Sequence, residues 1–121
     1  MKIGILGAGG IAVQMAKTVA GMKDVENYAV AARSLERAQA FAEKYGFSKA
    51  YGSYEEMLAD PLVDLVYIAT DWLHHFPVAK CALENGKNVA IEVPSAMNLK
   101  ECWELVDLSE KNRKHCMILE N

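Results

Sequence analysis

A glycine-rich turn near the start of the chain carries the clearest chemical signal. Gly7-Ala8-Gly9-Gly10-Ile11-Ala12 follows an apolar stretch at 2–6 that reads as a buried strand, and it precedes a helical pattern. Gly7 can adopt a tight turn, Gly9 has no Cβ to keep the backbone from a diphosphate, and Ala12 permits close packing of helix on strand. The N–H groups at the helix start, with the helix dipole, favour an anion. The turn therefore predicts a diphosphate site.

Strand and helix patterns alternate along the rest of the sequence. The spacing of apolar residues predicts strands at 2–6, 28–32, 49–51, 63–69, 88–93 and 115–119, with a helical stretch between each pair. Ser34 is expected to begin the second helix and Gly46 to end it, while Ser53 and Glu56 form a capping-box pattern. Apolar helix residues such as Phe41 and Trp103 are expected in the core.

This alternation predicts the fold class. Six strands separated by helices favour an α/β fold with a doubly wound, parallel, six-stranded sheet of the Rossmann type. The expected strand order is 3-2-1-4-5-6, with right-handed crossovers. Residues 1–121 are expected to form a single dinucleotide-binding domain, since the sequence shows no linker and no internal repeat beyond the alternation.

Composition narrows the classes of partner. The net charge of −3 and the lack of a Lys/Arg run argue against nucleic acid as a partner. No apolar run approaches the roughly 18 residues of a membrane span, and a lone Lys2 before a strand is not a signal peptide. We therefore expect a cytoplasmic protein. The three cysteines, Cys81, Cys102 and Cys116, lack the spacing of a zinc site, so we expect reduced structural thiols and no metal.

Several motifs together resemble one known family over the whole chain. They are the turn at 7–12 and the segments at 31–34 (AARS), 50–54 (AYGSY), 67–70 (YIAT), 86–89 (GKNV) and 92–94 (EVP). They resemble the N-terminal domain of the glucose-fructose oxidoreductase, inositol dehydrogenase and rhizopine-catabolism (Gfo/Idh/MocA) superfamily. The resemblance implies that this domain holds NAD or NADP. It also implies a second α/β domain with most of the substrate pocket, which we expect to be absent from this sequence.

The end of the second predicted strand bears on the choice of cofactor. An acidic residue there would accept hydrogen bonds from the ribose of NAD and repel a 2′-phosphate. This chain has Arg33 and Ser34 instead, with Arg37 one turn later. Arg33 can pair with a phosphate and Ser34 can donate to it. The sequence therefore favours NADP, with NAD as the alternative; on the other interpretation Arg33 is merely solvated and Ser34 is only a cap.

The segment after the fourth strand departs from the family pattern. Where the family has Thr-Pro-Asn and then a His, this chain reads Thr70-Asp71-Trp72-Leu73-His74-His75. By resemblance His75 takes the family's His position, where it either borders the nicotinamide pocket or fills space, and Asp71 is a candidate cap for the next helix. Two adjacent histidines cannot share one helix face, which argues against a metal site there.

The fifth strand shows the sharpest departure. The family pattern Glu-Lys-Pro places a lysine beside the reacting carbon, whereas this chain has Glu92-Val93-Pro94. Valine cannot donate or accept a proton, so an ordinary dehydrogenase mechanism is not expected. On the plainer interpretation Val93 is simply a residue that strands favour.

Part of the sequence is similar to another branch of the superfamily. Val93, Trp72 and the segments at 101–103, 114–117 and 119–121 are similar to glycoside hydrolase family 109, which includes α-N-acetylgalactosaminidases. That resemblance implies a tightly held NAD that oxidises a sugar hydroxyl transiently and takes the hydride back. Residues 1 to about 70 look more like the reductase branches. A chimera, a reconstruction or a design is one interpretation of this mixture.

These patterns favour an NAD(P)-binding domain of an oxidoreductase with little or no catalysis of its own. The alternatives are a fragment of an NAD-dependent glycosidase and an engineered module with a vestigial cofactor site. We expect self-association through surface that a missing domain would expose. No residue is assigned firmly to catalysis, although Glu92 and His75 are candidates. The predicted cofactor-binding residues are Gly7, Gly9, Gly10, Ile11, Ala12, Arg33, Ser34, Arg37, Ala69, Thr70, Asp71, Trp72, His75 and Glu92.

Overall fold

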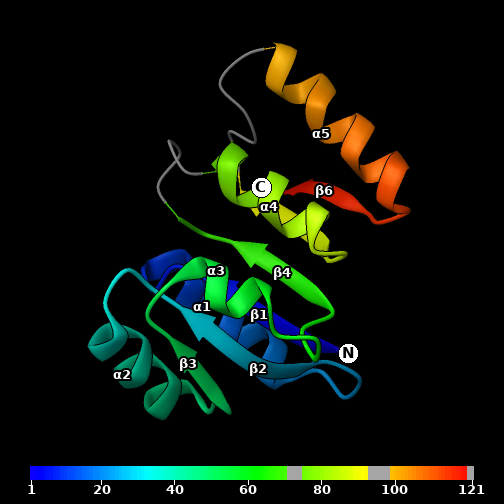
Figure 1. Ribbon diagram of the computed structural model, residues 1–121. Helices are drawn as coiled ribbons and strands as arrows, with labels where there is room; N and C mark the ends of the chain where they lie inside the picture. The colour runs from blue at the N-terminus through cyan, green and yellow to red at the C-terminus, as the bar shows by residue number, and fades with distance from the viewer. Residues whose placement is uncertain (71–74, 93–98, 120–121) are drawn as a thin grey trace.

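Strands and helices alternate along the chain, as Figure 1 shows. The computed structural model describes residues 1–70, 75–92 and 99–119. In chain order the elements are β1 (Lys2–Leu6), α1 (Gly10–Ala20), β2 (Glu26–Ala31), α2 (Leu35–Tyr45), β3 (Lys49–Tyr51), α3 (Tyr54–Leu58), β4 (Leu65–Ile68), α4 (His75–Glu84), β5 (Asn88–Glu92), α5 (Leu99–Asn112) and β6 (Cys116–Leu119).

The strands form one parallel sheet in the order β3-β2-β1-β4-β5-β6. Every neighbouring pair is parallel, and the register shifts once, between Ile3 and Gly4 where β1 pairs with β2. The order reverses between β1 and β4, so the chain winds outward in both directions from β1. The prediction of an α/β fold with a parallel, doubly wound sheet is confirmed.

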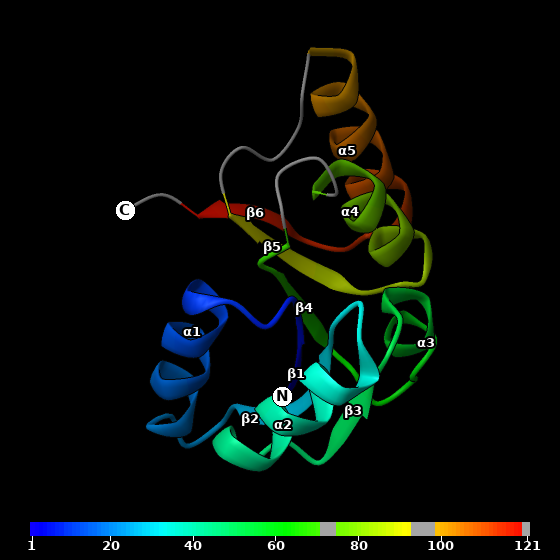
Figure 2. The same cartoon turned by 90° about the vertical axis from the view of Figure 1, so that its left-hand side faces the viewer.

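Helices lie on both faces of the sheet (Figure 2). A separate apolar core lies under each set of helices. The helices α1 and α2 pack on one face through Ala12, Ala16 and Phe41. The helices α3, α4 and α5 pack on the other face, where Met57 and Leu83 are fully buried. The central strands β1, β2 and β4 are therefore buried on both faces, which explains their nearly continuous apolar sequences.

The predicted helix caps are present. The Ser34 Oγ accepts a hydrogen bond from the Arg37 backbone N–H at 3.5 Å, and α2 ends at Gly46, whose φ of 79° lies in the left-handed region. The Ser53 Oγ accepts from the Glu56 N–H at 3.3 Å in the same way. Each hydroxyl satisfies a backbone donor that the helix cannot satisfy itself.

One expectation about a buried face is wrong. Trp103, expected in the core, is 60% exposed, because α5 instead turns Leu105 toward the sheet, at 4% exposure, with Leu108 packed beside the core. On α1 the buried residues include Ala12 and Ala16, while the larger Ile11 is 47% exposed. Close approach of the helix to the sheet selects small side chains for the buried face. By contrast, Phe41 is buried as predicted.

Strand β4 is shorter than the apolar run that predicted it. The run begins at Val63, yet the strand begins at Leu65. Val63 is buried in the preceding turn, where its N–H donates to the Asp60 carbonyl at 3.3 Å. The apolar run therefore predicts which residues are buried, but only part of the run is hydrogen-bonded to neighbouring strands.

Candidate functional site

The carboxyl ends of three neighbouring strands are tied together at one edge of the sheet. The Gly7 N–H donates to the Ala31 carbonyl at 2.8 Å, which joins the end of β1 to the end of β2. The Ala69 N–H donates to the Leu6 carbonyl, also at 2.8 Å, which joins β4 to β1. The loops that follow β1, β2 and β4 therefore start from a common line, at the point where the strand order reverses. Clefts at such a point are the usual ligand sites of open α/β sheets.

Gly7 is the residue that allows the chain to turn out of β1. Its φ is +106°, a backbone conformation that other residues adopt only with strain. A Cβ at this position would lie 2.5 Å from the Ala69 carbonyl oxygen. Both the turn and the contact with the loop after β4 therefore require glycine.

Gly9 is the N-cap of α1 and leaves the start of the helix open. Its backbone is extended, with φ −94° and ψ −168°, and a Cβ there would meet nothing within 4 Å. Because glycine has no side chain, it cannot cap the first backbone N–H groups, which have no acceptor within the helix. These donors, at the positive end of the helix dipole, form a surface suited to an anion.

A hollow of about 250 Å³ lies beside this turn. Its lining joins the loops after all three strands, with Tyr54 from the start of α3, and none of the described lining residues is acidic. The charged side chains that line the hollow are therefore the two guanidinium groups of Arg33 and Arg37. The lining residues are Gly7, Ala8, Gly9, Ala32, Arg33, Arg37, Tyr54, Ala69 and Thr70.

Six of the predicted cofactor residues line this hollow together, namely Gly7, Gly9, Arg33, Arg37, Ala69 and Thr70. Others lie next to it with different roles in the fold. Gly10 and Ile11 are exposed in the first turn of α1, while Ala12 is fully buried. Ser34 is the N-cap of α2.

Some predicted residues cannot be placed in this way. Asp71 and Trp72, with His74 and Val93, lie outside the described residues. The backbone of His75 begins α4 and that of Glu92 ends β5, but their side chains are also outside the described part. The part of the predicted site nearest the nicotinamide position therefore stays a prediction.

Tyr54 is a lining residue that the sequence interpretation missed. It borders the main hollow and a smaller adjoining one of about 210 Å³, which it shares with Arg33, Gly52 and Glu55. The available signal was its position: Tyr54 follows the carboxyl end of β3, next to β2 in the sheet. Loops at that edge are where ligands of this architecture bind.

A second polar cluster lies at the amino end of β4 and is largely buried, with Tyr51 half-buried at its edge. We call Asp60, Tyr28, Tyr51 and Lys87 the Asp60 cluster. Both tyrosine hydroxyls donate to the Asp60 Oδ2, at 2.9 Å and 2.7 Å, and the Leu62 N–H donates to its Oδ1 at 2.9 Å. The buried Lys87 ammonium donates to the Asp60 carbonyl at 2.6 Å. Each charged group in this cluster has a partner, which is what burial of charge requires.

The pKa values in the Asp60 cluster follow from these contacts. Burial opposes ionisation of the Asp60 carboxyl, but hydrogen bonds from Leu62, Tyr51 and Tyr28 outweigh it and lower the pKa below its usual value. Burial, followed by the hydrogen bond to Asp60, raises the pKa of Tyr51 to about 12. Burial lowers the pKa of Lys87, in part against the attraction of Asp60. The cluster therefore keeps a carboxylate beside neutral phenols over a wide pH range.

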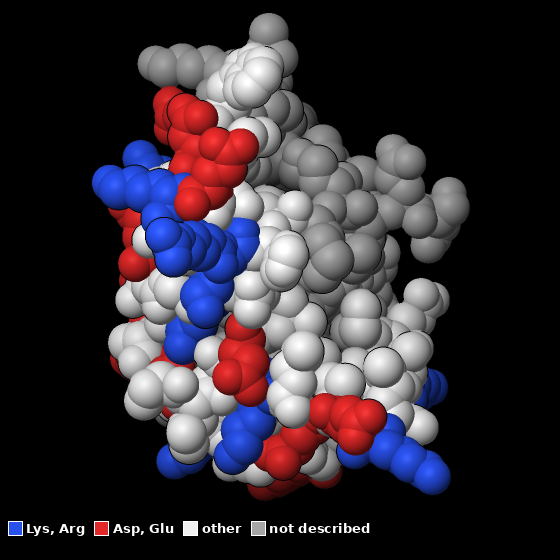
Figure 3. All heavy atoms as spheres, turned by 90° about the vertical axis from the view of Figure 1, so that its right-hand side faces the viewer, with Lys and Arg blue, Asp and Glu red and all other residues white. Residues whose placement is uncertain are grey.

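Lys and Arg side chains are interspersed with Asp and Glu on the face shown in Figure 3, and neither sign covers the described part of that face. No helix in residues 1–70, 75–92 and 99–119 is long and apolar enough to cross a membrane. In the same segments no three His, Cys, Asp or Glu side chains are grouped so that they could hold a metal ion.

The amino-acid sequence of this chain matches one family model and several known proteins. The family model described as "Oxidoreductase family, NAD-binding Rossmann fold" (GFO_IDH_MocA) matches residues 1–120. Glycosyl hydrolase family 109 protein 5 of Phocaeicola vulgatus is 81% identical over 68 residues, which are 56% of this chain and 13% of that protein. The α-N-acetylgalactosaminidase of Bacteroides fragilis is 46% identical over 96 residues, covering 79% of this chain and 22% of the enzyme. The matched segments thus cover less than a quarter of the length of these two relatives.

Solved structures share the fold closely. Biliverdin reductase from Synechocystis sp. PCC 6803, in complex with biliverdin and NADP+, superposes with a TM-score of 0.90 at 28% identity, over 97% of this chain and 37% of the reductase. A probable dehydrogenase from Thermotoga maritima gives 0.92 at 25% identity, over 98% of this chain and 35% of the other. In both, the matching region is about a third of a longer chain.

Proposed function

The chain belongs to the Gfo/Idh/MocA oxidoreductase family, whose members have an NAD-binding Rossmann fold, and we propose from this premise that it holds NADP in preference to NAD. The dinucleotide would lie across the carboxyl ends of β1, β2 and β4. When bound, the nicotinamide ring supplies hydride transfer. The residues of this domain bind and orient the dinucleotide, and substrate contacts come from elsewhere in a longer protein.

The open backbone at Gly9 is the observation that carries this proposal. A ligand can approach the first amides of α1 because the space where a Cβ would project is empty to 4 Å. Gly7 holds the turn in place by its positive φ and its bond to Ala31. A pyrophosphate matches this surface in charge and in its need for several backbone donors.

The preference for NADP rests on the residues after β2. Arg33 and Arg37 both line the hollow, and none of its described lining residues is acidic. Ser34 uses its oxygen as an acceptor in capping α2, so its hydroxyl hydrogen can still be donated to a phosphate. Two guanidinium groups and a hydroxyl suit a 2′-phosphate dianion. The related biliverdin reductase structure, which contains NADP+, supports this assignment.

Calorimetric titration of the chain with NADP and with NAD tests the proposal. We expect NADP to bind about ten- to a hundredfold more tightly, the gain from one charge-assisted hydrogen bond. Arg37→Gln should reduce the affinity for NADP by a similar factor and leave that for NAD nearly unchanged. Lys49→Gln, which removes an exposed charge from β3, is the matched control. Equal affinities of the wild-type chain for both dinucleotides would overturn the preference.

A second titration tests the diphosphate site separately. Gly9→Val should leave the fold intact, because its φ is accessible to any residue and its surroundings are open. The added side chain would occupy the space that the pyrophosphate needs, so both NAD and NADP should lose at least about tenfold in affinity, from separation of the phosphates and the amides. Undiminished binding of both dinucleotides by Gly9→Val would rule out the turn as the binding surface.

A second candidate function concerns the longer protein. The matches to glycosyl hydrolase family 109 proteins and to an α-N-acetylgalactosaminidase favour a parent that cleaves a glycosidic bond. Release of nitrophenol from nitrophenyl α-N-acetylgalactosaminide by a full-length parent would support this candidate. Steady consumption of NADPH with a carbonyl sugar would support a reductase instead. We propose that the 121-residue chain alone has little activity in either assay, since orientation of the substrate supplies much of the rate.

A further inference from the structure

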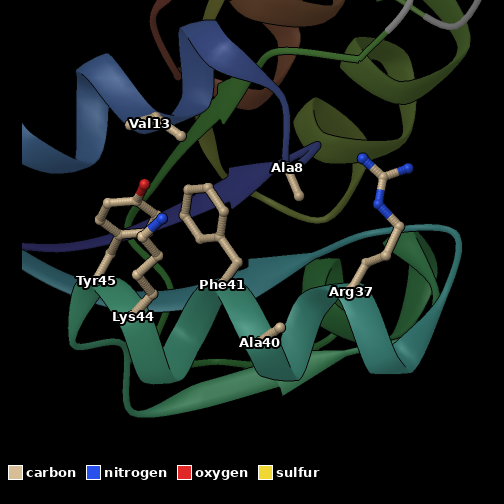
Figure 4. A pocket seen from close by; sticks show the side chains of 7 residues that line it. All are labelled: Ala8, Val13, Arg37, Ala40, Phe41, Lys44 and Tyr45. Atoms are coloured by element: carbon tan, nitrogen blue, oxygen red, sulfur yellow. The ribbon is translucent and has the colours of Figure 1, made fainter.

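A second hollow, of about 330 Å³, lies between α1 and α2 and reaches Ala8 of the glycine turn (Figure 4). We propose that this groove binds a small organic anion with a flat apolar body, such as an aryl carboxylate or an aryl sulfonate. The volume falls within the range of about 300–1,000 Å³ that is usual for small-molecule sites. It also exceeds the 250 Å³ of the hollow beside the diphosphate turn.

The floor and walls of the groove are apolar. The Phe41 side chain projects from α2 near the middle of the groove, and the Val13 side chain faces Phe41 from α1 (Figure 4). The Tyr45 ring lies against Phe41, with centroids 4.7 Å apart and planes tilted by 48°. Ala40, the next residue of the lining, is small and leaves space above the helix. Aromatic rings beside an open space of this kind suit a flat apolar ligand.

The charges at the groove are all of one sign. Arg37 and Lys44 stand toward opposite ends of the lining, and among its described residues none is acidic. They are seven residues apart on α2, which corresponds to about 10 Å along a helix. The Lys44 ammonium lies 5.5 Å from the centroid of the Tyr45 ring, so it is held beside the apolar wall. An apolar surface with a cation at each end selects an amphipathic anion.

The groove is distinct from the hollow of about 250 Å³ beside the glycine turn, where we propose that the dinucleotide binds and which we call the cleft. The two hollows share Ala8 and Arg37, but Val13, Phe41 and Lys44 line only the groove. The groove can therefore be tested with no dinucleotide present, whereas a bound 2′-phosphate would compete for Arg37. Because Arg37 lines both hollows, a substitution of Arg37 cannot test the groove by itself. Lys44 and Ala40 line the groove alone and are therefore the test residues.

The test is a fluorescence titration with 8-anilinonaphthalene-1-sulfonate, an aryl sulfonate that brightens in apolar sites. The variants are Lys44→Gln, which removes one cation, and Ala40→Trp, which fills the groove. Lys111→Gln on α5 is the control for loss of an exposed lysine. Circular dichroism of each variant establishes that it is folded, and amide NMR shifts of the wild-type chain locate the probe. If Ala40→Trp does not fold, Lys44→Gln and the NMR shifts still decide.

We expect saturable, one-to-one binding that Lys44→Gln weakens about three- to tenfold, as for loss of one partly exposed charge contact. Ala40→Trp should weaken it more than tenfold, and Lys111→Gln should not change it. Shifts should centre on α2 and the facing part of α1. The proposal is overturned if Lys44→Gln and Lys111→Gln behave alike. It is also overturned if saturating NAD displaces the probe while Lys44→Gln has no effect, since the probe would then occupy the cleft.

Discussion

Two regions differ in whether their polar groups have hydrogen-bond partners within the protein. One is the glycine turn at the carboxyl edge of the sheet, and the other is the Asp60 cluster at the amino end of β4. At the turn, Gly9 leaves the amides of α1 uncapped, with open space in front of them. In the cluster, the Asp60 carboxylate accepts three hydrogen bonds, two of them from tyrosine hydroxyls. The first region leaves donors for a ligand, and the second uses its donors within the fold.

This difference separates the proposed binding site from a structural cluster. Both regions contain charged residues, and within the Asp60 cluster burial and the hydrogen bond to Asp60 raise the pKa of Tyr51 to about 12. Perturbed pKa values are common at active sites, yet ion-pair and hydrogen-bond networks also produce them. In this chain the better guide to function is an accessible, unsatisfied backbone at a point where strand order reverses.

The largest expected effect is on stability, from Gly7→Ala. A Cβ there would combine a φ of +106° with a 2.5 Å approach to the Ala69 oxygen. The free energy of unfolding should fall by about 3 kcal/mol, from strain and backbone displacement together. Gly46→Ala is the matched control, because its φ is +79° but its surroundings are open; its cost should be about 1 kcal/mol. Urea denaturation measures both, and equal losses would remove the special role of the Gly7 contact.

The next effect comes from Asp60→Asn. The neutral amide weakens the hydrogen bonds from Tyr28, Tyr51 and the Leu62 N–H, so the free energy of unfolding should fall by about 2 kcal/mol. The affinity for NADP should not change, because the cluster is separate from the cleft. Asp107→Asn, an exposed position on α5, should change stability by less than about 0.5 kcal/mol. Loss of dinucleotide affinity with Asp60→Asn would contradict the division between the two regions.

The pH dependence of stability should report the same cluster. The pKa of Asp60 is lower in the folded chain than in the unfolded one, so its contribution is present above the unfolded value of about 3.9. That contribution is lost as the pH falls through the lower folded value. Urea midpoints between pH 7 and pH 3 should therefore fall further for the wild-type chain than for Asp60→Asn. If the midpoints of the wild-type chain and of Asp60→Asn fell in parallel, Asp60 would not be the main cause of the loss of stability at low pH.

At high pH the sign is reversed. The pKa of Tyr51 is raised in the folded chain, so its contribution is complete below the unfolded value of about 10 and is lost as the pH rises through about 12. Tyr51→Phe cannot ionise and should flatten the alkaline limb of the stability curve. The difference in tyrosinate absorbance at 295 nm between the wild-type chain and Tyr51→Phe would separate the titration of Tyr51 from that of the other four tyrosines; identical curves would contradict the assignment.

The smallest effects compare two helix caps. Ser34→Ala and Ser53→Ala each remove an oxygen that accepts a backbone N–H, at 3.5 Å and 3.3 Å, so each should lower stability by about 1 kcal/mol. Only Ser34 is proposed to donate to the 2′-phosphate, so only Ser34→Ala should reduce affinity for NADP, by about tenfold. Equal dinucleotide binding by the two variants would leave Ser34 as a cap alone.

Much of the fold followed from local sequence. The alternation of apolar runs predicted the α/β class, and Ser34, Gly46 and Ser53 predicted helix ends that the structure contains. The turn at Gly7 was predictable because positive φ and close backbone approach both select glycine. These features depend on nearby residues and on general packing rules, so a single sequence was sufficient for them.

Other features depend on contacts between distant segments. Asp60 meets Tyr28 and Lys87, which are 32 and 27 residues away, and no local pattern relates them. The exposure of Trp103 was mispredicted because a helix with several apolar residues has more than one candidate buried face. Tyr54 and the groove at Phe41 arise where neighbouring elements meet. Self-association and the cytoplasmic location stay predictions.

The position of β1 has a consequence for synthesis of the chain on the ribosome. This first strand lies inside the sheet, between β2 and β4. Its partner at Leu65–Ile68 is made only after some sixty further residues, which takes about 3–12 s at typical translation rates. During that interval one hydrogen-bonding edge of an apolar strand stays open to other chains. Chaperone contact with the nascent β1 strand should therefore end when β4 leaves the exit tunnel.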